Sequence, residues 1–286
     1  YELARLNETL RAKSITITEA ASLPTVPING MGLGKVGLSF VVGLFGGVGL
    51  AFVLENLDTR IHSSHQLERL TQLPMLGAVP RGQLYVDDYG NIDSKGNTGS
   101  LGEAYPLVGI NLQLLKEGNA FKTILITSTT LREDKSTVAV NLAQVLAERG
   151  QAVFIVESDL RHPVITELLD IELEDDSLGL SNLLTERSLE ANLLSQITYP
   201  AKQSSLFVIG SGQKVSNSTA LLASPPMEKL ISYLRAQGQM TLLDAPPVLG
   251  LADVSVLAPM VDGVVLVVKQ AQTKREQLFA AIRQLE

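Results

Sequence analysis

The second half of this chain alternates short apolar runs with stretches of helical periodicity, which restricts the folds open to it. Five runs are expected to form strands: Thr123–Thr127, Ala152–Glu157, Ser205–Ile209, Thr241–Asp244 and Gly263–Val268. Several are apolar throughout, as in strands that are buried on both faces. Strands that alternate with helices favour a mostly parallel sheet with helices on both faces. We therefore predict an α/β fold for this half.

Composition excludes several kinds of function. The chain has 286 residues and a net charge of −7, so it offers no basic surface for nucleic acid. It contains no cysteine, which excludes a disulfide framework, a thiolate metal site and a cysteine nucleophile. It begins with Tyr1 and stops at Glu286 within a helical pattern, and we interpret it as a piece of a longer protein.

An uncharged segment, Val36–Leu54, lies between Lys35 and Glu55. About 19 residues at about 1.5 Å each approach the thickness of the hydrocarbon core of a bilayer. The segment is therefore predicted to be a transmembrane helix. A buried, glycine-rich core helix is the alternative. Basic residues flank both sides of the segment, so local charge does not decide its orientation.

Three polar segments follow predicted strands: Thr127–Thr137, Glu157–Pro163 and Asp244–Pro247. In open α/β sheets, ligands bind beyond the carboxyl ends of the strands. We therefore expect the three segments to meet around one pocket that contains Lys135, Asp159 and Asp244.

The first segment places Lys135, Ser136 and Thr137 at the start of a predicted helix. Backbone N–H groups and the helix dipole attract anions there, lysine reaches phosphates, and a hydroxyl binds Mg²⁺. Phosphate-binding loops usually carry glycine where Thr129 and Asp134 stand. Aspartate tolerates left-handed geometry, but its carboxylate repels phosphate. Lys-Ser-Thr alone is equally compatible with an ordinary helix start.

The other two segments supply carboxylates. Glu157 and Asp159 lie two residues apart at a strand end and could flank a metal or accept a proton. A solvated turn between strand and helix is the alternative for this pair. Asp244 closes an apolar strand, where an aspartate can hold Mg²⁺ through water.

Together these motifs resemble those of the bacterial tyrosine kinases that are fused to polysaccharide co-polymerases, the chain-length determinants of capsule and exopolysaccharide assembly. That family's motifs resemble Ser-x-x-Pro-Gly-Glu-Gly-Lys-Ser-Thr, Asp-x-Asp-x-Arg and Asp-x-Pro-Pro. The matching residues are Thr127, Ser128, Glu133, Lys135, Ser136, Thr137, Asp159, Arg161, Asp244, Pro246 and Pro247. Glu157 stands for the first aspartate, and Leu131, Arg132 and Asp134 replace the proline and both glycines.

The resemblance implies a P-loop-type fold that binds ATP and Mg²⁺ and phosphorylates clustered tyrosines near the end of a neighbouring subunit. The catalytic residues by position are Lys135, Asp159 and Glu157, and the metal ligands are Ser136, Asp159 and Asp244. The implied nucleotide-binding residues are Ser128, Thr129, Thr130, Arg132, Glu133, Asp134, Lys135, Ser136, Thr137 and Arg161.

The resemblance also implies the domain order. Residues 1–35 end an extracytoplasmic region, residues 36–54 span the inner membrane, and residues 55–100 form a juxtamembrane segment and linker. Residues 101–286 form the kinase-like domain, which the resemblance places in the cytoplasm. The expected partners are other copies of the chain in the membrane and the polysaccharide polymerisation and export machinery.

The departures from the family lead us to expect impaired ATP binding and phosphoryl transfer. Besides the loop glycines, the family's ring motif Glu-x-x-Arg-x-x-Arg is altered, with Glu103 followed by Pro106 and Gly109. One alternative is an inactive scaffold in which Asp134 pairs with Lys135 and occupies the anion site. Another is a partition-type ATPase, although Thr130 stands where that class carries a second lysine.

Overall fold

The computed structural model describes residues 32–84, 86–87, 91–92, 100–115, 121–174, 177–186 and 191–286. The chain divides into two compact units, Tyr1–Asp58 and Thr59–Glu286. The expected extracytoplasmic region, residues 1–31 in particular, and most of the linker around residues 88–99 lie outside the described residues.

The described part of the first unit is one helix, α2 (Leu33–Leu57), which contains the predicted span. Its mean hydropathy reaches 2.2 over an 18-residue window, and none of that window is buried by protein. At about 1.5 Å per residue, 25 residues are long enough to cross a bilayer. By length and composition, α2 is a candidate membrane span.

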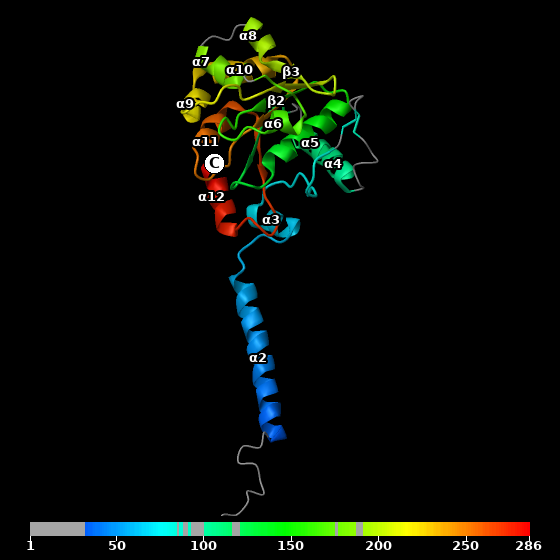
Figure 1. Ribbon diagram of the computed structural model, residues 1–286, viewed down its shortest axis with the longest axis vertical. Coiled ribbons are helices and arrows are strands. Elements are labelled where there is room, and N and C mark those ends of the chain that lie inside the picture. The colour runs from blue at the N-terminus through cyan, green and yellow to red at the C-terminus, as the bar shows by residue number, and fades with distance from the viewer. Residues whose placement is uncertain are drawn as a thin grey trace, which may run out of the picture. The chain divides into compact units, whose positions relative to one another are not determined.

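A sheet forms the centre of the second unit (Figure 1). It has six strands in the order β3-β4-β2-β5-β1-β6. The strands are β1 (Thr123–Ser128), β2 (Val153–Glu157), β3 (Thr198–Pro200), β4 (Leu206–Ile209), β5 (Met240–Asp244) and β6 (Gly263–Val267). All neighbouring pairs are parallel except β3 with β4. The predicted α/β class with a mostly parallel sheet is confirmed. β3 was not predicted, because three residues that end in proline carry little strand signal.

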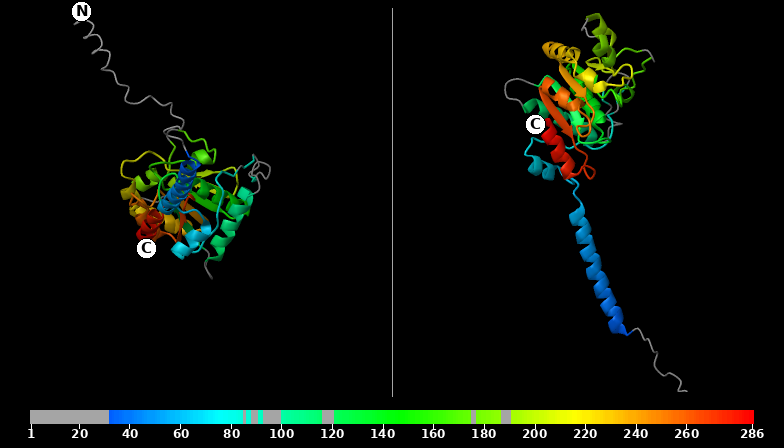
Figure 2. Two further views of the ribbon diagram at one scale, coloured as in Figure 1. Left: turned by 90° about the horizontal axis from the view of Figure 1, so that it is seen from below. Right: turned by 90° about the vertical axis from the view of Figure 1, so that its left-hand side faces the viewer.

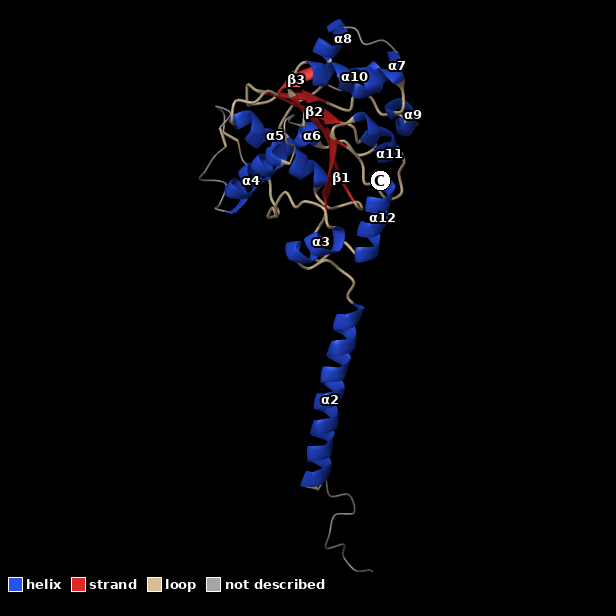
Figure 3. Cartoon of the chain, turned by 180° about the vertical axis from the view of Figure 1, so that it is seen from behind, coloured by secondary structure: helices blue, strands red, loops and turns tan. Residues whose placement is uncertain are grey.

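Helices cover both faces of the sheet, as the view from behind in Figure 3 shows. One face packs on α4 (Ser100–Leu114), α5 (Lys135–Glu148) and α6 (Ile165–Leu168). The other packs on α7 (Leu180–Glu186), α8 (Ala191–Gln196), α9 (Ser218–Leu222), α10 (Pro225–Ala236), α11 (Asp253–Leu257) and α12 (Arg275–Leu285). A short 3-10 helix, η1 (Ala258–Met260), precedes β6. Ile124 and Ile126 belong to the first core and Leu125 to the second, as the alternation of a strand requires.

The segment that follows residue 58 packs into this second unit. Helix α3 (Ser64–Thr71) has Ser63 as its N-cap, and the Ser63 hydroxyl accepts from Gln66 N at 3.2 Å. α3 and α12 lie side by side in the views of Figures 1 and 2. Ile61 and Leu84 are buried. The compact unit starts at Thr59 and so includes part of the expected juxtamembrane segment, from which Leu84 joins the core.

Candidate functional site

Neighbouring strands β2, β5 and β1 end at the same edge of the sheet. Asp244 is in register with Ile126 of β1 and with Glu157 of β2. The three polar segments therefore leave adjacent strands side by side. Hydrogen bonds continue beyond the strands, because Val248 N donates to Ser128 O at 2.9 Å and Thr127 Oγ1 donates to Pro246 O at 2.6 Å. The loops after β1 and β5 are thereby held against each other.

Lys135 lies at the centre of a buried charge cluster at this edge. Its ammonium Nζ is 2.9 Å from Asp159 Oδ2 and 3.5 Å from Asp244 Oδ1. The side chain of Lys135 is 11% exposed, and each aspartate side chain is 1% exposed. Ser136 Oγ donates to Asp244 Oδ2 at 2.7 Å. The predicted convergence of Lys135, Asp159 and Asp244 is thus present in the structure.

Asp244 has an unusual protonation equilibrium. Burial raises the pKa of its carboxyl to about 6, against the opposing effects of the Lys135 ammonium and the Ser136 hydrogen bond. The charges of Asp159 and Glu157 add to the rise in pKa. A carboxyl with this pKa exchanges its proton near neutral pH, and a bound cation would favour its ionised form.

The loop after β1, residues 129–134, has left-handed backbone geometry at positions 132 and 134, where the family motif carries glycine. Arg132 has φ 67° and Asp134 has φ 60°. Non-glycine residues adopt this geometry at a cost of about 1 kcal/mol or more each. The loop thus has the turns that glycine would allow, although its residues are less suited to them.

Glu133 organises the loop from inside. The residue is 3% exposed. Its carboxylate accepts from Thr129 N at 2.7 Å, Thr130 N at 3.1 Å, and the hydroxyls of Thr129, Thr130 and Thr273. These five hydrogen bonds to the Glu133 carboxylate hold the loop in its folded shape. Two expected phosphate-site residues, Thr129 and Thr130, are therefore already bound to a neighbouring carboxylate.

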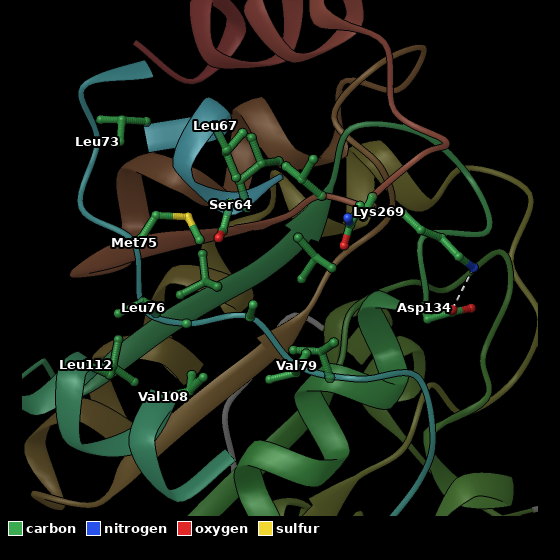
Figure 4. Close-up of a pocket in the computed structure, with 18 of the residues that line it drawn as sticks. Ser64, Leu67, Leu73, Met75, Leu76, Val79, Val108, Leu112, Asp134 and Lys269 are labelled. Atoms are coloured by element: carbon green, nitrogen blue, oxygen red, sulfur yellow. Dashed lines mark hydrogen bonds and ion pairs between the residues drawn. The ribbon is translucent and has the colours of Figure 1, made fainter. Parts of the chain in front are cut away.

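Asp134 forms its ion pairs with residues other than Lys135. Its Oδ2 lies 2.6 Å from Lys269 Nζ (Figure 4). The same oxygen lies 3.6 Å from Arg81 Nε. Among the described residues, the ion pairs of Lys135 are instead with Asp159 and Asp244. The pairing of Asp134 with Lys135 that we expected for an inactive scaffold is therefore wrong, because Lys269 attracts the carboxylate to the other side of the loop.

Glu157 and Arg161 have partners away from Lys135. Both oxygens of the buried Glu157 accept from backbone N–H groups, those of Val164, Ile165 and Ser211. Arg161 Nη2 donates to Thr219 Oγ1 at 3.3 Å. Its Nε lies 3.5 Å from the buried Asp253. Of the two carboxylates after β2, Asp159 therefore contacts Lys135, whereas Glu157 binds the backbone of the loop that follows.

Two residues of the site were not predicted. Lys269 and Thr273 come from the turn after β6, and they contact the phosphate loop through Asp134 and Glu133. No motif marks them. Their position in the sequence could have indicated them, because Lys269 follows an apolar strand that ends at the same edge of the sheet as the three selected segments.

The donors at Lys135 fit a magnesium ion that is shared with a phosphate ligand. Asp244 Oδ1 is buried and accepts no hydrogen bond among the described residues. Ser136 supplies a hydroxyl beside it. Within the described chain, no group of three or more His, Asp or Glu side chains forms a metal site by itself. Mg²⁺ typically takes one or two carboxylates and completes its shell with phosphate oxygens and water.

Fold and site together define a P-loop-type α/β protein with a lysine–carboxylate centre. No family model matches the chain. It is 32% identical to the tyrosine-protein kinase YwqD of Bacillus subtilis over 179 residues, or 63% of this chain and 73% of that relative. The chain belongs to the bacterial tyrosine kinase family.

Two further comparisons extend the likeness. The putative tyrosine-protein kinase EpsB of Ralstonia nicotianae is 26% identical over 96% of this chain, which spans only 37% of that relative. The kinase domain of the Escherichia coli tyrosine kinase ETK matches with TM-score 0.68 and 21% identity, over 79% of this chain and 89% of that domain. At that identity, the structural match concerns the fold.

Proposed function

We propose that this chain binds Mg·ATP at the carboxyl edge of its sheet and acts as a tyrosine autokinase-like regulator of exopolysaccharide or capsule polymerisation and export. The observation that carries the proposal is the convergence of Lys135, Ser136, Asp159 and Asp244 from three neighbouring strands. Membership of the tyrosine kinase family supports the reaction type.

Each residue of the centre has a role that its position allows. Lys135 would bind phosphate oxygens, and Ser136 and Asp244 would hold Mg²⁺, which would supply positive charge beside the phosphates. The tyrosine oxygen bonds to the γ-phosphorus, the bond from phosphorus to the ADP oxygen breaks, and Asp159 accepts the hydroxyl proton. Because Lys135 Nζ is 2.9 Å from Asp159 Oδ2, bound phosphate would draw the ammonium away and free that carboxylate for the proton.

We propose that phosphoryl transfer is slower than in a relative with a glycine loop. Arg132 and Asp134 adopt left-handed geometry without being glycine, and Asp134 adds a carboxylate near the phosphates. The arginine positions of the ring motif also differ. Pro106 lies inside α4, and a Cβ on Gly109 would lie 3.4 Å from Leu146. Neither residue can form the forked ion pairs of arginine.

We further propose that α2 anchors the chain in the inner membrane with the α/β unit in the cytoplasm, as part of a homo-oligomer. The length and hydropathy of α2 support the anchor. The EpsB relative, which matches 96% of this chain, supports an arrangement in which the anchor and the kinase-like unit belong to one polypeptide.

The second candidate function is an inactive scaffold of the polysaccharide export complex. It is favoured by the neutralisation of Lys135, whose ammonium already contacts two carboxylates. The loop carboxylate of Asp134 also opposes phosphate binding. A scaffold would keep the family fold and the membrane anchor and would have lost nucleotide affinity.

Calorimetry with Mg·ATP on the full chain in detergent micelles separates the two candidates. A binding-competent kinase should show saturable affinity that Lys135→Ala removes, and it should form phosphotyrosine on a tyrosine-rich peptide. Two matched variants separate strain from charge, because Arg132→Gly relieves a left-handed residue whereas Asp134→Gly also removes the carboxylate. Absence of binding by the parent, with recovery in Asp134→Gly, would establish the scaffold.

A further inference from the structure

Lys269 contacts both strained residues of the phosphate loop. This lysine lies two residues beyond the end of β6. Its Nζ donates to Asp134 Oδ2 at 2.6 Å and to the carbonyl oxygen of Arg132 at 3.0 Å. Those two acceptors belong to the residues with φ 60° and 67°. One ammonium therefore binds the loop at each point where glycine has been replaced.

The turn that carries Lys269 also binds the residue between them. Thr273 Oγ1 donates to the Glu133 carboxylate at 2.5 Å. The turn is closed on itself, because Lys269 N donates to Thr273 Oγ1 at 3.1 Å and Thr273 N donates to Lys269 O at 3.0 Å. Three consecutive loop residues, Arg132, Glu133 and Asp134, are thus held by one short turn from a distant part of the sequence.

The charge balance of this contact bears on phosphate binding. A carboxylate in a phosphate-binding loop repels the negatively charged phosphates. A lysine ammonium in direct contact with the carboxylate cancels most of this repulsion at the distance of the phosphates. Figure 4 shows the Lys269 side chain reaching Asp134 at the end of an apolar cavity. The side chains of Lys269 and Asp134 are 25% and 34% exposed, so water screens the pair only in part.

We propose that Lys269 is a positioning residue for nucleotide phosphates. It compensates for the missing glycines by neutralising Asp134, by turning that carboxylate away from Lys135, and by fixing the left-handed turn at Arg132. The ligand concerned is the phosphate chain of a nucleoside di- or triphosphate, so this inference rests on the proposed function. The proposal predicts that tight binding of the nucleotide phosphates needs Lys269 chiefly when Asp134 is present.

Arg81 offers a matched control. It approaches the same carboxylate oxygen at 3.6 Å, but its side chain is 82% exposed. Such an exposed pair contributes little, because solvent screens it and both long side chains lose freedom. Removing Arg81 deletes the same charge near Asp134 and leaves the hydrogen bond from Lys269 to the Arg132 carbonyl in place. Both variants lose one formal positive charge, so a difference between them reports the direct contacts of Lys269 rather than the net charge of the chain.

The test uses the full chain in detergent micelles and the variants Lys269→Met, Arg81→Met, Asp134→Gly and the double variant Lys269→Met with Asp134→Gly. Calorimetry gives Kd for Mg·ADP. We expect Lys269→Met to raise Kd about tenfold, as loss of one charged hydrogen bond would. Arg81→Met should change Kd by less than about twofold.

The double variant gives the decisive comparison. Its Kd should exceed the Asp134→Gly value by about threefold or less, because Lys269 then has no carboxylate to neutralise and only its bond to the Arg132 carbonyl to lose. A general folding defect would persist in that background. An equal loss of affinity with and without Asp134 would overturn the inference, as would equal effects of Lys269→Met and Arg81→Met.

A second readout separates this inference from the proposed function. Hydrogen exchange of the amides of residues 129–135 is measured without nucleotide. Lys269→Met should accelerate exchange of these amides about tenfold or more, whereas Arg81→Met should not. If the parent binds no nucleotide, the proposed function fails, and the exchange result alone then decides whether Lys269 positions the loop. Unchanged exchange in Lys269→Met would refute the positioning role.

Discussion

Ser136 Oγ donates a hydrogen bond to Asp244 Oδ2 at 2.7 Å, and this bond joins the first turn of α5 to the carboxyl end of β5. The other oxygen of Asp244 faces Lys135 Nζ at 3.5 Å. The two residues that would hold a magnesium ion are therefore already in contact in the protein alone. The bond also fixes the phosphate loop relative to the central strand, so the site should be largely formed before any ligand arrives.

The buried carboxyl of Asp244 makes stability depend on pH. Its pKa rises from 3.8 to about 6 on folding, chiefly through burial. The native state therefore favours the protonated form, and the associated stability is lost as pH rises through about 6. The loss should reach roughly 2–3 kcal/mol between pH 4 and pH 7.

Asp244→Asn should remove that loss, because asparagine stays neutral. We expect the free energy of unfolding of this variant to exceed the parent's by about 1–3 kcal/mol at pH 7.5 and to be similar at pH 4. Urea unfolding of the full chain in micelles across this pH range measures both. Parallel pH profiles for parent and variant would contradict the assignment.

Lys135→Met should destabilise the protein, in addition to removing phosphoryl transfer. The side chains of Asp159 and Asp244 are each 1% exposed, and the variant leaves both without their common cation. Breaking a buried pair in this way costs about 3–5 kcal/mol. Thermal and urea unfolding test this expectation.

A surface lysine supplies the control for that loss. Lys202 pairs with Asp170 at 3.1 Å, with side chains 38% and 75% exposed. Lys202→Met should change the free energy of unfolding by no more than about 0.5 kcal/mol. A small effect of Lys135→Met, comparable with this control, would contradict the stabilising role of this buried ion pair.

Glu133→Gln should destabilise the protein by more than the loss of a single charged hydrogen bond would. The carboxylate accepts five hydrogen bonds, two from backbone N–H groups and three from threonine hydroxyls. A glutamine amide turns half of that acceptor surface into donors. We expect the free energy of unfolding to fall by about 2–4 kcal/mol. Thr273→Val, which removes one donor, should cost about 1 kcal/mol, and equal losses would argue against this organising role.

Local sequence signals predicted most of the sheet and three of the loops at its edge. Apolar runs gave β1, β2, β4, β5 and β6 to within a residue or two, and the rule that parallel strands share a carboxyl edge brought Lys135 together with Asp159 and Asp244. The same reasoning failed for Asp134. Its partner, Lys269, lies 135 residues away and belongs to no motif.

Two further features of the structure have the same physical origin. The carboxylate of Glu157 is used by backbone N–H groups of Val164, Ile165 and Ser211, and their approach depends on packing that sequence spacing does not encode. The start of the compact unit at Thr59 depends on Ile61, which is isolated among polar neighbours but is buried through contacts with the turn after β6. Long-range packing decides both cases.

Glu157→Gln and Asp159→Asn should separate a supporting residue from a reacting one. Glu157 accepts three backbone hydrogen bonds, so its amide variant should lower the free energy of unfolding by about 2 kcal/mol or more. Asp159 faces Lys135 Nζ at 2.9 Å and would accept the proton of the tyrosine hydroxyl. Its amide variant should reduce phosphotyrosine formation about 100-fold or more, with Mg·ADP affinity changed far less. Phosphotyrosine yield at saturating ATP, measured together with urea unfolding, tests both expectations. A larger activity loss in Glu157→Gln than in Asp159→Asn, at unchanged stability, would assign the proton to Glu157.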